Sequence, residues 1–151
     1  MSILRKLTLA IVMAFSLSLL VATPAAATGA DPRDKQADIK VCKVLKDARD
    51  NKNATFSFVI REKKPQGERD KYKFDIVVKK GDGEKCKKFT VDKGTYVVRE
   101  KGMPAGFKLQ SIDVKGSCFY KDRSDRDAKI VVELKAKGKC TVTFTNKKDG
   151  R

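Results

Sequence analysis

Hydrophobic and polar residues alternate in short runs along most of the chain after residue 38. Alternation with a period of two is typical of β-strands that have one buried face. Turn-forming segments such as Gly81-Asp82-Gly83 separate the runs, and no stretch keeps a helical period. The chain is therefore predicted to be an all-β, antiparallel sandwich of about seven to eight strands. The expected runs cover residues 39–45, 55–61, 73–78, 87–91, 95–100, 107–114, 129–134 and 140–145.

The first 27 residues follow a different pattern. A basic start with Arg5 and Lys6 precedes an apolar run to about Val21, and small residues follow up to Ala27. This order is typical of a cleaved secretory signal peptide, and the apolar run is shorter than the ~20 residues of a membrane-spanning helix. We therefore expect a secreted chain with no transmembrane segment after residues 1–27 are removed. Its parts are expected to be a flexible segment (28–37), a single domain (38–147) and a loose tail (148–151).

Strand parity assigns the apolar side chains to one face of each run. Three of these core-facing series end in a polar residue, which is Lys43 in the first, Glu100 in the fifth and Asn146 in the last. The apolar members of the same series are Ile39 and Val41, Tyr96 and Val98, and Val142 and Phe144.

Four segments together resemble the Cna-B or SpaA-like prealbumin-fold domains of Gram-positive secreted and surface proteins. They are Lys43-Val44, residues 89–100 (Phe-Thr-Val-Asp-Lys-Gly-Thr-Tyr-Val-Val-Arg-Glu), Met103-Pro104-Ala105-Gly106-Phe107 and Thr143-Phe144-Thr145-Asn146. The resemblance covers about residues 38–147 and implies a prealbumin-like β-sandwich.

The resemblance also implies a covalent crosslink. In members of that family a lysine on the first strand bonds to an asparagine on the last, and a buried acid promotes the reaction. The matching positions are Lys43, Asn146 and Glu100. A buried lysine becomes a neutral nucleophile, whereas a buried glutamate stays protonated and can donate a hydrogen bond to the amide oxygen. Three other interpretations stay open: Lys43 extends to solvent, Lys43 and Glu100 form a plain ion pair, or Asn146 simply ends a strand.

The four cysteines are predicted to form two disulfides, because an even number in a small exported domain is typical of an oxidising compartment. Their spacing matches no metal site, and the chain has no histidine, so neither a metal nor a cofactor is expected. The alternation of side chains along each strand places Cys118 and Cys140 on inward faces and places Cys42 and Cys86 on outward faces. This favours the pairs Cys118–Cys140 and Cys42–Cys86. A bulge between residues 114 and 118 would reverse the direction of Cys118.

The chain is strongly basic, with 35 Lys and Arg against 19 Asp and Glu. Loss of the two cations of the leader reduces the net charge from +16 to +14. Such a charge attracts polyanions, and the alternative is that the lysines form an ordinary solvated face. Partners are therefore expected among anionic cell-wall polymers or extracellular proteins, and nucleic acid is not expected. The candidate polyanion-binding residues are Lys63, Lys64, Lys79, Lys80, Lys85, Lys87 and Lys88.

No catalytic function with turnover is expected, because the chain lacks histidine and shows no free-cysteine or paired-carboxylate pattern. The sequence favours a secreted structural or adhesion-type binding module that is crosslinked for extracellular stability. Without an LPxTG-type motif, covalent anchoring to a wall is not expected, and the protein would be free or held at the cell surface by charge. The alternative is a cationic protein that binds anionic cell-wall or surface polymers.

Overall fold

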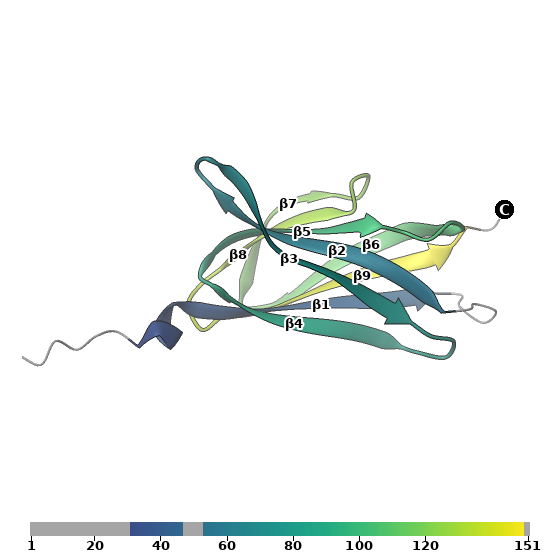
Figure 1. Ribbon diagram of the computed structural model, residues 1–151, viewed down its shortest axis with the longest axis horizontal. Coiled ribbons are helices and arrows are strands. Elements are labelled where there is room, and N and C mark those ends of the chain that lie inside the picture. Colours follow the sequence, from purple (N-terminus) through teal and green to yellow (C-terminus); the bar gives the residue numbers. More distant parts are fainter. Residues whose placement is uncertain (1–30, 47–52, 150–151) are drawn as a thin grey trace, which may run out of the picture.

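The computed structural model describes residues 31–46 and 53–149, and the predicted signal peptide lies outside them. Over this part, the chain forms nine strands and one short 3₁₀ turn, η1 (Pro32–Lys35) (Figure 1). No helix in this part is long and apolar enough to cross a membrane. The strands are β1 (Gln36–Lys46), β2 (Ala54–Lys64), β3 (Gly67–Val78), β4 (Glu84–Asp92), β5 (Gly94–Gly102), β6 (Phe107–Gly116), β7 (Cys118–Ser124), β8 (Lys129–Leu134) and β9 (Lys139–Lys148).

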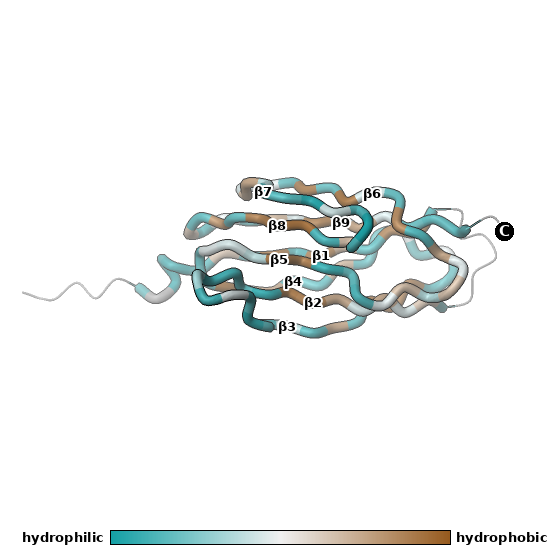
Figure 2. The backbone as a smooth tube through the Cα atoms, turned by 90° about the horizontal axis from the view of Figure 1, so that it is seen from above, coloured by the Kyte–Doolittle hydropathy of each residue, from teal (hydrophilic) through white to brown (hydrophobic). Residues whose placement is uncertain are grey.

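The strands form two sheets, in the orders β4-β1-β9-β6 and β3-β2-β5-β8-β7. In Figure 2 the two sheets overlap, and the strands of each sheet follow these orders from top to bottom, from β7 to β3 and from β6 to β4. The predicted all-β sandwich is confirmed. One correction concerns strand direction, since β1 and β9, the first and last strands, are parallel while the other described pairings are antiparallel. A pairing between the two ends of a chain leaves no local turn signal in the sequence.

A second correction concerns the number of strands, because β7 has no counterpart among the eight predicted runs. It is an edge strand, and its residues from Phe119 to Arg123 are all exposed. A strand without a buried face has no reason to alternate, so periodicity could not reveal it. The first described strand begins at Gln36 and the last ends at Lys148.

The inner faces of the two sheets form one hydrophobic core. The side chains of Phe56, Tyr96 and Phe144 are fully buried, and the rings of Phe58 and Phe144 meet edge to face with centroids 5.3 Å apart. Burial of a large apolar side chain contributes about 1.5–3 kcal/mol. The buried hydroxyl of Tyr96 donates to the carbonyl oxygen of Asp92 at 2.7 Å, so its polar end is satisfied. Three polar side chains, Lys43, Glu100 and Asn146, are buried together with this core.

Candidate functional site

Lys43, Glu100 and Asn146 lie together inside the sandwich. Lys43 comes from β1 and Asn146 from its parallel neighbour β9, where their register partners are Phe144 and Leu45 respectively. Glu100 comes from β5 in the facing sheet. Because side chains two residues apart share a face, the inward positions of Val41 and Phe144 carry Lys43 and Asn146 inward as well. The structure thus brings together the three residues that strand parity placed in the core.

The carboxylate of Glu100 is the centre of the group. Its Oε1 lies 3.1 Å from the amine Nζ of Lys43, and the side-chain amide Nδ2 of Asn146 donates a hydrogen bond to the same oxygen at 3.1 Å. Relative exposure is 0% for Lys43, 4% for Glu100 and 0% for Asn146. The amine nitrogen of Lys43 and the amide nitrogen of Asn146 therefore both lie next to the same carboxylate oxygen.

Hydrogen bonding in the group is incomplete. Within the described residues, Nζ of Lys43, Oε2 of Glu100 and Oδ1 of Asn146 are buried and have no hydrogen-bond partner, although Nζ is within ion-pair distance of Oε1. A buried polar atom without a partner costs about 1–3 kcal/mol. These three atoms therefore make the arrangement of the three side chains an unfavourable one in the core.

An aromatic side chain lies against the amine. The Nζ atom of Lys43 lies 4.4 Å from the centroid of the Phe56 ring on β2, close enough for a cation–π contact. Phe56 was not among the predicted site residues. The sequence does carry its signal, because Phe56 lies between the polar residues Thr55 and Ser57 and two positions before Phe58. An apolar wall of this kind keeps water away from the amine and strengthens the effect of burial.

Burial changes the proton affinities of both ionisable groups. Desolvation lowers the pKa of Lys43 from 10.5 to about 8, against the opposing charge of Glu100. Desolvation likewise raises the pKa of Glu100 above 4.5, against the opposing charge of Lys43. The two shifts are in the directions that favour transfer of a proton from the ammonium to the carboxylate. The product of that transfer is a neutral amine beside a neutral acid.

The position of the Asn146 amide differs from the expected one. The sequence predicts that protonated Glu100 donates to the amide oxygen, but in the structure Asn146 donates through Nδ2 to Oε1. An ionised carboxylate can only accept hydrogen bonds, so the contact in the structure suits ionised Glu100 and the expected contact suits protonated Glu100. After Glu100 is protonated, rotation of the carboxamide by half a turn would bring Oδ1 to the donor.

Two of the alternative interpretations do not fit the geometry. The Lys43 side chain has no exposed surface, so its amine does not reach solvent. Asn146 does not end its strand, because β9 continues to Lys148. The third alternative, an ion pair between Lys43 and Glu100, is present at 3.1 Å.

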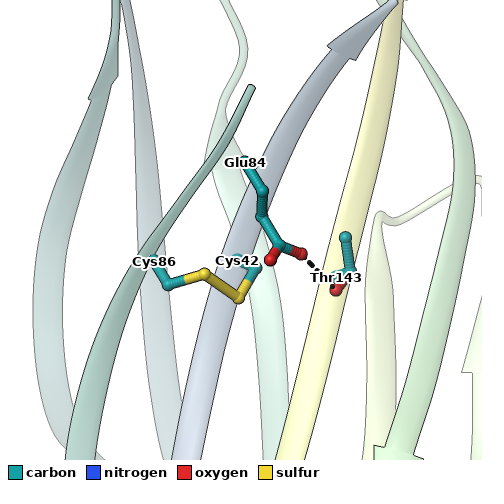
Figure 3. Close-up of a disulfide and its surroundings, with 4 residues drawn as sticks. All are labelled: Cys42, Glu84, Cys86 and Thr143. Atoms are coloured by element: carbon teal, nitrogen blue, oxygen red, sulfur yellow. Dashed lines mark hydrogen bonds between the residues drawn. A yellow bond between two sulfur atoms is a disulfide. The ribbon is translucent and has the colours of Figure 1, made fainter. Parts of the chain in front are cut away.

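Two disulfides brace the sandwich, between Cys42 and Cys86 and between Cys118 and Cys140. These are the pairs favoured by strand parity. The first joins β1 to β4 on the outer face of one sheet, next to Glu84, whose carboxylate accepts a hydrogen bond from Thr143 (Figure 3).

The second disulfide joins the two sheets, and it does so in a way that parity did not describe. Cys118 does not continue β6 but starts β7 in the facing sheet. The chain changes sheets at Gly116, which has a φ of 105° and where a Cβ would collide with the carbonyl oxygen of Lys139. Only glycine fits this conformation and this close approach.

One group of potential metal ligands lies close together within the described residues, namely Cys42, Glu84 and Cys86. Both sulfurs belong to the disulfide, so they are not available as thiolate ligands.

The seven predicted polyanion-binding lysines are exposed but do not form one cluster. Lys63 and Lys64 end β2, whereas Lys79 and Lys80 follow β3 at the opposite end of the same hairpin. The other three, Lys85, Lys87 and Lys88, lie on β4. Lys85 pairs with Asp82 at 3.2 Å, Lys88 pairs with Asp38 at 2.9 Å, and Lys87 lies over the Phe74 ring at 6.0 Å.

Comparison with known proteins gives structural likeness only. No family model matches the chain, and no curated protein matches it. Among solved structures, the T-13 major pilin of Streptococcus pyogenes matches with 12% identity and a TM-score of 0.41, over 76% of this chain and 46% of the pilin. A mutant of the pilus-presented adhesin Cpa matches with 14% identity and a TM-score of 0.42, over 79% of this chain and 29% of the adhesin. Another major pilin of Streptococcus pyogenes matches with 18% identity and a TM-score of 0.39, over 76% of this chain and 48% of that one.

The chain spans less than half the length of each of these three proteins. It is structurally similar to β-sandwich domains of streptococcal pilins and of a pilus adhesin. At these identities and scores the likeness carries no argument about function.

Proposed function

We propose that this protein is an extracellular structural module of the surface or adhesion type, in which an isopeptide bond joins Lys43 to Asn146. The observation that carries the proposal is the burial of these two side chains around a single oxygen of Glu100. The two disulfides support an extracellular location, because such bonds persist in oxidising compartments.

The proposed reaction is a single amide exchange within the folded core. Glu100 accepts a proton from the ammonium of Lys43, and the neutral Nζ attacks Cγ of Asn146. A bond forms between Nζ and Cγ, and the bond between Cγ and Nδ2 breaks. One proton passes from Nζ to Nδ2, and ammonia leaves. Oε1 of Glu100 is within hydrogen-bond distance of both nitrogens, which is the position that a proton carrier needs.

The bond would join the first and last strands of the domain. Because β1 and β9 are neighbours, tension applied to the two ends of the chain would act directly on this pair of strands. A covalent link between Lys43 and Asn146 would carry that tension past all the strands between them. The crosslink therefore suits a protein that must resist force and proteolysis outside the cell. The module performs no turnover, since each molecule reacts once.

The test is the intact mass of the purified, reduced protein beside two variants. Wild type is expected to be lighter than its sequence by one ammonia. Glu100→Ala is expected to have the full mass, because the proton carrier is missing. Glu133→Gln is the matched control, since Glu133 lies on β8 and pairs with Lys121 at 2.6 Å, away from the site. A wild-type protein of full mass would contradict the proposal.

A further inference from the structure

Lysines cross the outer face of the four-stranded sheet in a row. The register places Lys88 of β4 opposite Lys40 of β1, Lys40 opposite Thr141 of β9, and Thr141 opposite Lys115 of β6. Lys139, two residues before Thr141, lies on the same face of β9. We call Lys40, Lys88, Lys115 and Lys139 the basic row. All four side chains are exposed.

One acidic residue, Asp38, lies beside two lysines of the basic row. Lys88 pairs with Asp38 at 2.9 Å, and Lys139 lies opposite Asp38 in the register of β1 and β9. Within residues 31–46 and 53–149, Lys40 and Lys115 form no ion pair. Like charges directly opposite one another on neighbouring strands destabilise a sheet. Lys40 and Lys88 are such a pair, so the row has a cost that a bound anion would remove.

The outer face of the other sheet has the opposite arrangement. There, Arg61 of β2 pairs with Asp70 at 2.6 Å, Lys73 pairs with the same aspartate at 2.8 Å, and Lys121 of β7 pairs with Glu133 at 2.6 Å. Several cations on that face are therefore paired with acidic neighbours, although Arg99 and Lys129 also lie opposite one another there. The basic row differs in that its lysines extend across all four strands of its sheet.

The surface beside the row is hollowed. One shallow hollow of about 190 Å³ is lined by residues of the row and by Asp38, Cys140 and Thr141. A second, of about 270 Å³, shares Asp38 and continues toward the end of β1, where Arg33 and Lys137 line it. Apart from the shared Asp38, the charged residues that line the two hollows are basic.

We infer that the basic row is a binding site for a linear phosphodiester polymer that lies across the outer face of the four-stranded sheet. Lysine ammonium groups and the Thr141 hydroxyl donate hydrogen bonds in many directions, which suits tetrahedral phosphate oxygens. The row contains no arginine, whose planar fork would hold a single carboxylate or phosphate group in one fixed orientation. The outward residues of the four described strands include no aromatic ring on which a nucleic-acid base could stack. A flexible polyol-phosphate chain fits these features.

Only one of the row's lysines, Lys88, was among the candidates taken from the sequence. The adjacent lysine pairs that dominate that set place their two side chains on opposite faces of a strand or in turns. The row is formed by residues far apart in the chain, and only the register of four strands brings them side by side.

The test measures binding of poly(glycerol phosphate) to the whole protein and to two triple variants of equal charge. One variant carries Lys40→Gln, Lys115→Gln and Lys139→Gln. Its control carries Lys63→Gln, Lys79→Gln and Lys80→Gln, which are exposed lysines outside the row. A lysine beside an anionic surface is worth roughly fivefold in affinity, so the row variant is expected to bind on the order of 100-fold more weakly. Affinity should fall steeply with salt, and the row variant should have the shallower salt dependence.

Heparin, poly-glutamate and single-stranded DNA distinguish the polymer classes in the same assay. The inference holds if poly(glycerol phosphate) binds more tightly than these three and the control variant binds like wild type. If both triple variants lose the same amount of affinity, binding depends on the net charge of the protein and not on the basic row, which would contradict the inference. Tighter binding of heparin or poly-glutamate would overturn the assignment to a phosphodiester chain, and tighter binding of single-stranded DNA would overturn the assignment to a polyol-phosphate chain. No binding at low salt would overturn the site as well. None of these substitutions touches Lys43, Glu100 or Asn146, so the mass test of the crosslink stands separately.

Discussion

Two lysines of β1, Lys40 and Lys43, lie three residues apart and on opposite faces of the same strand. Lys43 has no exposed surface, and its amine lies 3.1 Å from Glu100. Lys40 is exposed, and its neighbour across the strands is another lysine, Lys88. Desolvation makes the first a candidate nucleophile, whereas water keeps the second a cation that attracts anions. The comparison shows that the side of the sheet, and not the residue type, decides the chemistry of a lysine here.

The largest effect is expected from Asn146→Ala, which removes the proposed crosslink but keeps the ion pair of Lys43 with Glu100. Closing a loop on the order of 100 residues stabilises by about 4–5 kcal/mol. We therefore expect the midpoint of thermal unfolding to fall by roughly 15 °C, measured by circular dichroism without reductant. Lys147→Ala, at the next position of the strand, is the control and should unfold close to wild type. A midpoint for Asn146→Ala equal to that of wild type would mean that no crosslink forms.

A smaller effect is expected from pH in the same Asn146→Ala background. The pKa of Lys43 is about 8 in the folded state and 10.5 for an unperturbed lysine, so the unfolded chain binds more protons between these values. Stability should therefore rise with pH across this window, by on the order of 3 kcal/mol at about 1.4 kcal/mol for each pH unit. The raised pKa of Glu100 acts in the opposite sense at lower pH, where stability falls as pH rises above 4.5.

Urea unfolding between pH 7.5 and 10.5 measures the first of these slopes. The double variant Lys43→Met with Asn146→Ala is the control, because it keeps the other lysines and lacks the buried one. If both proteins show the same pH dependence, the buried amine of Lys43 does not have a lowered pKa.

The smallest effect is expected on the exposed face. Lys40→Gln removes the repulsion from Lys88 and should raise the free energy of unfolding by about 0.2–1 kcal/mol at low salt. Added salt should reduce this gain, because it screens exposed charges. Urea titrations at low and high salt measure both values. A loss of stability would contradict this account, because it would show that the favourable contacts of Lys40 outweigh its repulsion from Lys88.

Periodicity predicted the buried site well because its three residues continue regular strands. Val41, Val98 and Phe144 are apolar and fully buried, and the residues two positions later follow them inward. The class of fold follows from the same alternation. Strand β7 could not be predicted this way, since neither of its faces is buried from Phe119 to Arg123.

The pairing of strands that are distant in the sequence was the other feature that periodicity could not predict. The parallel neighbours β1 and β9 come from the two ends of the domain, and no local turn links them. The basic row depends on that register as well. The environment of Cys118 could not be predicted either. The alternation of side chains along β6 says nothing about Cys118, because the chain passes to the other sheet after Gly116.

The central claim, that burial turns Lys43 into a nucleophile toward Asn146, is tested most directly by mass spectrometry of a protease digest. The reduced and alkylated wild-type protein should yield one branched peptide in which the Lys43 segment is joined to the Asn146 segment, with the loss of one ammonia. The Glu100→Ala variant should yield the two segments separately. Recovery of two separate, unmodified segments from wild type would contradict the account.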